Sequence, residues 1–214
     1  MMIQDFKNKA VLVTGGTKGL GLAIGKAFAA EGAHVTLTHR WGTADEDTIR
    51  AEFAALGAPE PRLVEADASH DDDTVALLEE MKTTHGSIDV FVSNVSFAQV
   101  NKKVLDGLTR KDLHRSLSYS AWPMVGYLKK IKAIFGRYPR YSLGTSCDGP
   151  ETYYPGYDYV AVSKAVMETY CRYLGKHIWE AEGGTVNILR SRPVSTDSLR
   201  STFGEEYEPF LRKW

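Results

Sequence analysis

The residues best suited to chemistry near the start of the chain are three glycines. Gly15, Gly19 and Gly21 follow the apolar run 10–14 and precede a segment of helical periodicity. Where a strand turns into a helix, glycine lets backbone N–H groups and the helix N-terminus approach a phosphate closely. The segment therefore predicts a dinucleotide-binding turn, and a turn that needs glycine for its geometry alone is the alternative. The residues expected to contact the cofactor here are Gly15, Thr17, Lys18, Gly19, Leu20 and Gly21.

The end of the predicted strand 34–38 bears on the choice of cofactor. An NAD-binding site usually offers a carboxylate to the ribose hydroxyls about 20 residues beyond the glycines. Here His39 and Arg40 stand instead. Arg40 can bind a 2'-phosphate through two hydrogen bonds, and Lys18 lies beside the same pocket. The sequence therefore favours NADPH over NADH, and the alternative is that Arg40 is an ordinary solvated charge.

A tyrosine and a lysine in the segment 157–164 are candidates for acid–base chemistry. At about 100° per residue, Tyr157 lies roughly 20° from Lys164 around a helix, whereas Tyr159 lies roughly 140° away. Tyr157 and Lys164 are thus expected on one face, about 10 Å apart along the helix axis. A ligand between the two side chains is a better link than a direct hydrogen bond. For Tyr159 we expect a packing role.

Two kinds of segment alternate along the chain and must position these residues. The short apolar and β-branched segments are 10–14, 34–38, 62–66, 88–93, 141–144 and 185–190. The segments of helical periodicity are 20–30, 46–56, 71–84, 109–135 and 157–180. Six strands alternating with helices predict an α/β fold: one doubly wound, Rossmann-like parallel sheet in a three-layer αβα domain over residues 1–214.

Length and composition exclude several other classes of protein. The chain has 214 residues, 43% hydrophobic and 25% charged, which is enough for one domain with a buried core. The net charge of -1 gives no reason to expect a nucleic-acid partner. No apolar run suits a signal peptide or a membrane span, and Cys147 and Cys171 have no metal-ligand spacing. We therefore expect a cytoplasmic protein that binds no metal and no membrane.

These motifs together resemble the short-chain dehydrogenase/reductase superfamily. The spacing G-x-x-x-G-x-G over residues 15–21 is the superfamily's glycine motif. Asp67 resembles its adenine-contacting aspartate, with an ordinary strand-end residue as the alternative, and Asn94 retains one asparagine of the Asn-Asn-Ala-Gly motif. Thr196 falls where the family threonine meets the nicotinamide carboxamide. The resemblance thus implies further cofactor contacts at Asp67, Ala68, Asn94, Lys164, Val194 and Thr196.

One branch of the superfamily resembles this chain more closely than the others. Most members place a tyrosine four residues before the lysine, where Val160 stands here. A tyrosine seven residues before the lysine is similar to the enoyl-acyl-carrier-protein reductases. Phe-Ala at 97–98 and Ser-Tyr-Ser at 118–120 also resemble that branch. Because the glycine motif is of the common type, the nearest likeness is to the enoyl reductases that keep TGxxxGxG.

Departures from the family pattern bear on the reaction. Ser120 stands where carbonyl-reducing members have an asparagine that supports a water relay for protons. Cys147 replaces the second tyrosine of the commonest enoyl reductases, and Ser-Arg at 191–192 replaces a Pro-Gly pair. Reduction of a carbon–carbon double bond conjugated to a thioester places charge on the thioester oxygen. A hydroxyl such as that of Tyr157 can stabilise that enolate.

The first hypothesis is therefore an NADPH-dependent reductase of an enoyl thioester, of fatty-acid or polyketide type. The resemblance gives Tyr157 the hydroxyl, and gives Lys164 the nicotinamide ribose and a positive potential. Ser146 either adds a hydrogen bond or only caps local structure. A ketone or 3-oxoacyl-thioester reductase is the alternative with the same fold. The altered motif positions also allow a catalytically silent NADPH-binding protein.

Expected partners follow from charge and from the resemblance. A small acyl, enoyl or carbonyl compound is the expected substrate. A basic stretch either contacts an acidic acyl-carrier protein or is a solvated helix face, and it contains Lys129, Lys130, Lys132, Arg137 and Arg140. The segment after Thr196 is shorter than the family's usual further helix and closing strand. By resemblance alone, a homodimer or homotetramer is expected.

Overall fold

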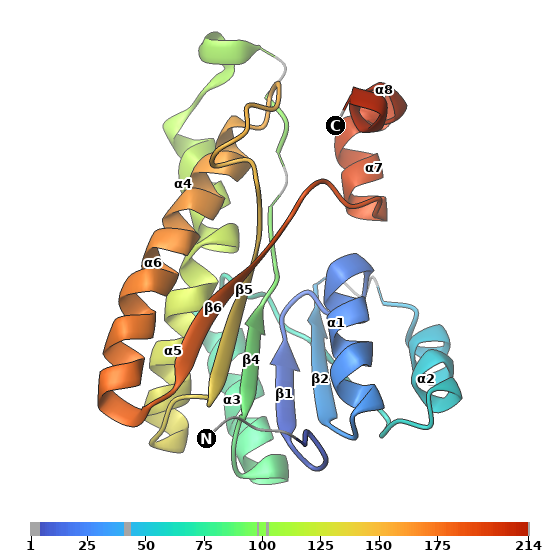
Figure 1. The fold of residues 1–214 in the computed structure, drawn as a ribbon, viewed down its shortest axis with the longest axis vertical. Helices are drawn as coiled ribbons and strands as arrows, with labels where there is room; N and C mark the ends of the chain where they lie inside the picture. The colour runs from blue at the N-terminus through green and yellow to red at the C-terminus, as the bar shows by residue number, and fades with distance from the viewer. Residues whose placement is uncertain (1–4, 41–43, 98, 102, 214) are drawn as a thin grey trace.

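The alternation of apolar and amphipathic segments produces a parallel sheet between layers of helices (Figure 1). The computed structural model describes residues 5–40, 44–97, 99–101 and 103–213, so Ala98 of the Phe-Ala pair lies outside the described residues. All strand pairs are parallel, and the order is β3-β2-β1-β4-β5-β6. The strands are β1 (Ala10–Val13), β2 (His34–His39), β3 (Arg62–Glu65), β4 (Val90–Ser93), β5 (Tyr141–Cys147) and β6 (Thr185–Ser191). The predicted doubly wound sheet is confirmed.

Helices cover both faces of this sheet. On one face lie α1 (Gly19–Ala30) and α2 (Glu46–Ala55), and on the other lie α3 (Asp71–His85), α4 (Arg110–Ser120), α5 (Trp122–Phe135) and α6 (Asp158–Glu182). The remaining elements are η1 (Val104–Gly107), α7 (Asp197–Phe203), η2 (Gly204–Glu206) and α8 (Tyr207–Lys213). None of the helices in the described ranges is long and apolar enough to cross a membrane.

Successive side chains of the central strands point to opposite faces of the sheet, so the hydrophobic core has one part on each face. Leu12 and Phe91 point into the core under α3, α5 and α6, whereas Val11 and Val13 point into the core under α1 and α2. All four side chains are fully buried. This is why β1 consists entirely of apolar residues, as a strand buried on both faces requires.

The segment 109–135, expected as one helix, forms two. Helix α4 ends at Ser120, and α5 begins at Trp122 after Ala121, whose φ of -115° and ψ of -50° interrupt the regular helix. Pro123 lacks the N–H group that would donate to the carbonyl of Tyr119, so a continuous helix would lose a hydrogen bond there. The proline therefore places the break between α4 and α5.

The topology gathers the candidate residues at one edge of the sheet. In a parallel sheet the carboxyl ends of all strands meet at the same edge, and ligands bind where the strand order reverses. Here the order reverses at β1, which pairs with β2 on one side and β4 on the other. Helices α7 and α8 lie beyond this edge (Figure 1). The site is therefore expected between the strand ends and these two helices.

Substitution of Gly21 tests the tight packing under the glycine turn. A Cβ atom at this position would overlap the carbonyl oxygen of Gly15 and the side-chain amide of Asn94. We expect Gly21→Ala to lower the free energy of unfolding by about 1–3 kcal/mol in urea titrations followed by circular dichroism.

Gly175→Ala in α6 is the matched control, because the nearest contact of its new Cβ would be an ordinary 3.4 Å to the carbonyl oxygen of Val186. A helix-interior glycine replaced by alanine should leave stability unchanged or raise it by up to about 1 kcal/mol. Equal stability of Gly21→Ala and the wild type would contradict the described packing.

Candidate active site

The turn between β1 and α1 presents backbone donors to the edge of the sheet. Gly15 and Gly19 have φ values of +61° and +51°, which L side chains rarely adopt. The N-cap residue Lys18 makes no side-chain hydrogen bond to the helix start. The first N–H groups of α1 therefore have no partner within the helix and can bind an anion. These features fit the diphosphate of a dinucleotide.

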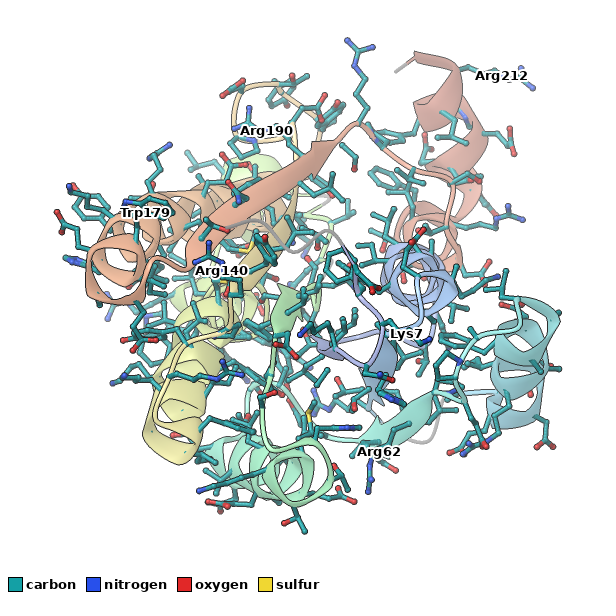
Figure 2. All side chains as sticks on the ribbon, turned by 60° about the horizontal axis from the view of Figure 1, so that its bottom comes forward. Lys7, Arg62, Arg140, Trp179, Arg190 and Arg212 are labelled. Carbon is teal, nitrogen blue, oxygen red and sulfur yellow. The ribbon has the colours of Figure 1, made fainter. Side chains whose placement is uncertain are left out.

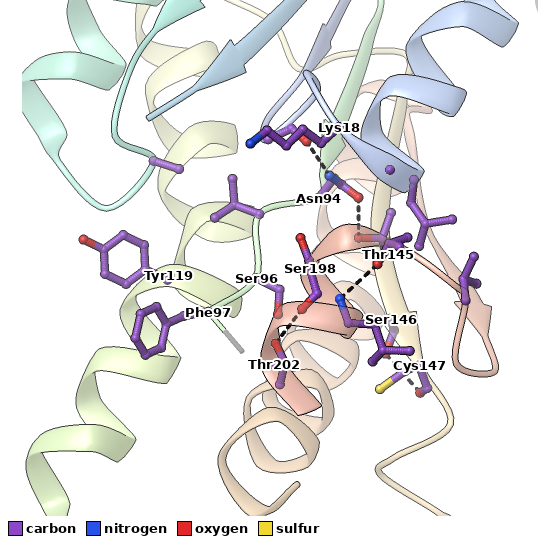
Figure 3. A pocket seen from close by; sticks show the side chains of 18 of the residues that line it. Lys18, Asn94, Ser96, Phe97, Tyr119, Thr145, Ser146, Cys147, Ser198 and Thr202 are labelled. Atoms are coloured by element: carbon purple, nitrogen blue, oxygen red, sulfur yellow. Dashed lines mark hydrogen bonds between the residues drawn. The ribbon is translucent and has the colours of Figure 1, made fainter. Parts of the chain in front are cut away.

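A cavity of about 540 Å³ opens beside this turn (Figure 3). It runs along the carboxyl edge of the sheet, and residues of α7 form part of its wall. The predicted site residues that line it are Gly15, Thr17, Lys18, Gly19, Leu20, His39, Arg40, Asp67, Ala68, Asn94, Ser146, Tyr157, Lys164, Val194 and Thr196. Gly21 is the exception, because its position faces the turn and Asn94 inside the protein. Its contribution is to packing beneath the turn and not to the cavity wall.

Asn94 joins the glycine turn to the ends of β4 and β5. Its side-chain N–H donates to the carbonyl oxygen of Gly15 at 2.9 Å, and its side-chain oxygen accepts from the Thr145 hydroxyl at 3.2 Å (Figure 3). Its backbone N–H donates to the Thr14 hydroxyl at 3.1 Å. The one asparagine retained from the family motif thus holds three strand ends in fixed positions.

Lys164 lies on α6 and reaches the same strand end. Its ammonium donates to the carbonyl oxygen of Thr145 at 2.7 Å, and the side chain is buried. Burial lowers the pKa of Lys164 to about 8, although the nearby Cys147 and Glu168 act in the opposite direction. The positive charge of Lys164 is therefore sensitive to pH just above neutrality.

Tyr157 lies on the cavity wall immediately before α6. Its ring stacks on Phe203 at a centroid distance of 6.4 Å and meets Tyr154 edge-on at 5.8 Å. Burial, together with the hydrogen-bonded thiol of Cys147, raises the pKa of Tyr157 above its ordinary value. The phenol is therefore protonated at neutral pH and able to donate. Tyr157 and Lys164 line one cavity, although Tyr157 is the N-cap of α6 and not a residue within it.

Tyr159 has the structural role expected of it. Its side chain is buried, and its hydroxyl accepts a hydrogen bond from the N–H of Thr109 at 2.5 Å. The same hydroxyl is 3.3 Å from the carbonyl oxygen of Gly107. Tyr159 thus fixes the start of α4 against α6 and does not line the cavity.

An ion pair between Arg40 and Asp67, which the sequence did not predict, lies on the cavity wall beside the ends of β2 and β3. The Nε of Arg40 is 2.8 Å from a carboxylate oxygen of Asp67, and the Tyr119 hydroxyl contacts both side chains. Burial alone would raise the pKa of Asp67, but two hydrogen bonds from Ser69 and the charge of Arg40 lower it. Both carboxylate oxygens of Asp67 therefore have partners, and Arg40 is held in place beside the cavity.

Several cavity residues were not predicted from the sequence. Phe97 and Tyr119 form an aromatic pair with centroids 5.7 Å apart on the wall opposite the strand ends (Figure 3). The α7 residues of the wall are Ser198, Leu199 and Thr202. A signal for α7 was present, because Thr196 followed by Asp197 is typical of a helix start. The Thr196 hydroxyl indeed accepts from the N–H of Leu199 at 3.2 Å.

The basic stretch considered for a carrier protein lies away from the cavity. It runs from α5 to the start of β5, so it is at the amino edge of the sheet. Lys130 pairs with Asp71 at 2.6 Å. Lys132 pairs with Glu182. These lysines belong to ion pairs on the surface of the protein, which favours the interpretation as a solvated helix face.

Comparison with known proteins identifies the family. The sequence profile of the family described as enoyl-(acyl carrier protein) reductase matches residues 15–214. A glucose and ribitol dehydrogenase homolog from Oryza sativa subsp. japonica is 30% identical over 94% of this chain and 71% of the relative. Enoyl-acyl-carrier-protein reductase (NADH) FabI from Aquifex aeolicus is 24% identical over 92% of this chain and 73% of that protein. A short chain dehydrogenase from Burkholderia cenocepacia J2315, crystallised in complex with NADP, has a TM-score of 0.79 at 24% identity and covers 92% of this chain and 83% of that one.

The fold and the cavity are those of a dinucleotide-binding α/β oxidoreductase. The chain belongs to the short-chain dehydrogenase/reductase superfamily and, within it, to the family described as enoyl-(acyl carrier protein) reductase. It is an NAD(P)H-dependent short-chain oxidoreductase.

The titration of Lys164 should be visible in cofactor binding. Because its pKa is about 8, the ammonium is charged below that pH and progressively neutral above it. A cation beside the bound anionic cofactor strengthens binding, so we expect the affinity for NADPH to be nearly constant between about pH 6 and pH 7 and to fall as the pH rises through about 8 toward 10. Fluorescence titration of NADPH over this range measures it.

Lys164→Met provides the control for that titration. This variant should bind NADPH more weakly at pH 7 and lose the decline that the wild type shows as the pH rises through about 8. A wild-type affinity that stays constant to pH 10, or the same decline in Lys164→Met, would rule out this role for the lysine.

Proposed function

We propose that the protein is an NADPH-dependent reductase of an enoyl thioester, of fatty-acid or polyketide type. The observation that carries the proposal is the placement of Tyr157, whose phenol shares one cavity with Lys164 and the glycine turn. The Ser120 oxygen, at the position of the relay asparagine, accepts the backbone N–H of Phe97 at 2.9 Å. The site therefore offers a hydroxyl for an oxyanion without the asparagine of the carbonyl-reducing members.

The residues that line the cavity and those packed behind its wall supply three functions for this reaction. A nicotinamide bound in this cavity would supply the hydride. The phenol of Tyr157, protonated because burial raises its pKa, donates a hydrogen bond to the thioester oxygen as it gains negative charge. Lys164 adds positive potential on the same wall from its position against the Thr145 carbonyl. Phe203 and Tyr154 pack around Tyr157 and exclude water from its ring.

Arg40 and Lys18 support NADPH as the reductant. Both line the cavity, and the Asp67 contact fixes the Arg40 guanidinium beside it. The guanidinium thereby keeps its positive charge on the cavity wall, where that charge favours a 2'-phosphate over a free hydroxyl. The acidic residue that would accept hydrogen bonds from free ribose hydroxyls is absent from positions 39 and 40.

A ketone or 3-oxoacyl-thioester reductase is the second candidate function. The relative from Oryza sativa is named a glucose and ribitol dehydrogenase homolog, and that name implies oxidation and reduction at a carbonyl carbon. The phenol of Tyr157 would serve an alkoxide as well as an enolate. NADPH oxidation with an acetoacetyl thioester, and none with a crotonyl thioester, would select this candidate.

The proposed partners are a thioester substrate and a second copy of the chain. Exposed apolar residues on α6, Val162, Tyr170 and Tyr173, support the homodimer that the family resemblance implies. The paired lysines of α5 give no support to a carrier protein docking there.

The choice of cofactor can be tested at Arg40. Loss of a charge-assisted hydrogen bond to a phosphate should lower the affinity of Arg40→Gln for NADPH by about 10- to 100-fold. NADH lacks that phosphate, so its affinity should change little. Dissociation constants of both nucleotides, measured by fluorescence, give the comparison.

Arg50→Gln removes the same charge from α2, where Arg50 pairs with Glu46 and Glu60 away from the cavity. It should alter neither dissociation constant. If the wild type binds NADH as tightly as NADPH, or if Arg40→Gln weakens both nucleotides equally, the cofactor proposal is wrong.

The catalytic proposal is tested at Tyr157. We expect Tyr157→Phe to lower kcat for crotonyl-thioester reduction by about 100-fold or more, because a donor to the developing oxyanion is lost. Tyr153→Phe is the matched control, since this tyrosine of the same loop is 76% exposed. The Tyr153→Phe variant should reduce the crotonyl thioester at the wild-type rate. Near-wild-type activity of Tyr157→Phe would remove the assigned chemistry.

A further inference from the structure

A chain of hydrogen-bonded side chains connects the protein surface with the cavity wall. The Ser146 hydroxyl is 2.5 Å from one carboxylate oxygen of Glu168, and Arg190 is 2.5 Å from the other. The second guanidinium nitrogen of Arg190 is 2.7 Å from Glu151 in the loop after β5. Figure 2 shows Arg190 on β6, close to that loop. These hydrogen bonds and ion pairs therefore join β5, α6, β6 and the loop that leads to Tyr157.

The chemistry of these groups fixes the direction of each hydrogen bond. Arg190 has N–H donors and no acceptor, so Glu168 must accept from it. A carboxylate paired with a guanidinium is ionised and accepts hydrogen bonds only, so the proton between Ser146 and Glu168 belongs to Ser146. The other acceptor near the Ser146 hydroxyl, the carbonyl oxygen of Cys147, is more distant at 3.4 Å. Ser146 therefore donates into the protein.

The hydrogen bond between Ser146 and Glu168 is buried at the cavity wall and is not a contact on the protein surface. Ser146 and Glu168 are 5% and 7% exposed, and Ser146 lines the cavity. A hydroxyl has one proton and two lone pairs. With its proton on the Glu168 side, Ser146 has only oxygen lone pairs left for a ligand in the cavity.

We propose that Glu168 is a positioning residue that fixes Ser146 as a hydrogen-bond acceptor and leaves the substrate oxygen to the phenol of Tyr157. This inference rests on the proposed reduction of a thioester in this cavity. Glu168 thereby disfavours carbonyl reduction, in which a second donor beside Tyr157 would stabilise the alkoxide. An enolate that is delocalised over a thioester depends less on that second donor.

Glu168→Gln reverses the hydrogen bond while keeping the shape of the side chain. The amide oxygen of the new side chain must face Arg190, because Arg190 can only donate. The amide N–H₂ group then faces Ser146 and donates to its oxygen. The hydroxyl proton of Ser146 is released toward the cavity, where a substrate oxygen can accept it.

The test compares two substrates on the same protein. The ratio of kcat/KM for an acetoacetyl thioester to that for a crotonyl thioester should rise at least about tenfold in Glu168→Gln. The rise should disappear in the double variant Ser146→Ala, Glu168→Gln, because the released proton is gone. A ratio is unaffected by the fraction of folded enzyme, so partial unfolding cannot imitate the result.

Glu151→Gln is the matched control. It removes the other acidic partner of Arg190 on the exposed side of the network, where Glu151 is 69% exposed. The substrate ratio should remain at the wild-type value. An unchanged ratio in Glu168→Gln, or a rise that persists without the Ser146 hydroxyl, would overturn the positioning role.

Infrared spectroscopy gives a readout that needs no turnover. A butyryl thioester with a ¹³C-labelled carbonyl cannot be reduced at a double bond, and its C=O stretch falls when another donor binds the oxygen. The stretch should fall in Glu168→Gln relative to the wild type and return in the double variant. An identical stretch in all three proteins would contradict the inference.

Failure of the proposed function has a different signature. A wild type that reduces neither thioester, or only the acetoacetyl thioester, refutes enoyl reduction whatever happens at Glu168. The infrared comparison of bound butyryl thioester still tests Glu168 in the first case. Where the wild type reduces only the acetoacetyl thioester, the rates with that substrate test the role of Glu168. Glu168→Gln should raise these rates only when Ser146 is present.

Discussion

The hydrogen bonds of Asn94 are the constraint on which the geometry of the site depends. They join the carbonyl of Gly15 in the glycine turn to the hydroxyl of Thr145 at the end of β5. The carbonyl of the same Thr145 holds the ammonium of Lys164. Two segments that are far apart in the sequence thus keep a fixed separation, because β1, β4 and β5 are neighbours in the sheet. The glycine turn and Lys164 of α6 therefore face the same cavity in a fixed arrangement.

Features that depend on local periodicity and backbone geometry could be predicted from the sequence. The apolar run that includes Val11 and Val13 indicated a strand buried on both faces. The glycines after it indicated a turn, in which Gly15 and Gly19 have positive φ. Helix geometry also predicted that Tyr157 and Lys164 would face one space, and both line the cavity. In the segment 109–135 the apolar periodicity predicted one helix, whereas Pro123 marks the break that the structure shows.

Contacts between distant segments could not be predicted in this way. The pairing of Arg40 with Asp67 joins the ends of β2 and β3, and the stacking of Phe203 on Tyr157 requires α7 to fold back over the cavity. No local signal fixes either contact. The proton of Ser146 likewise depends on Glu168, which lies 22 residues further along the chain on another element.

The site combines a fixed glycine turn, a buried lysine and a phenol that remains protonated, and these features suit the proposed delivery of hydrogen to an activated double bond. The most direct test follows the transferred atom. In this test the protein is incubated with a crotonyl thioester and NADPH that carries deuterium at both C4 positions of the nicotinamide, and any product is examined by deuterium NMR. We predict a butyryl thioester with deuterium at C3. Deuterium on the carbinol carbon formed from an acetoacetyl thioester, with none transferred to crotonyl, would contradict the account.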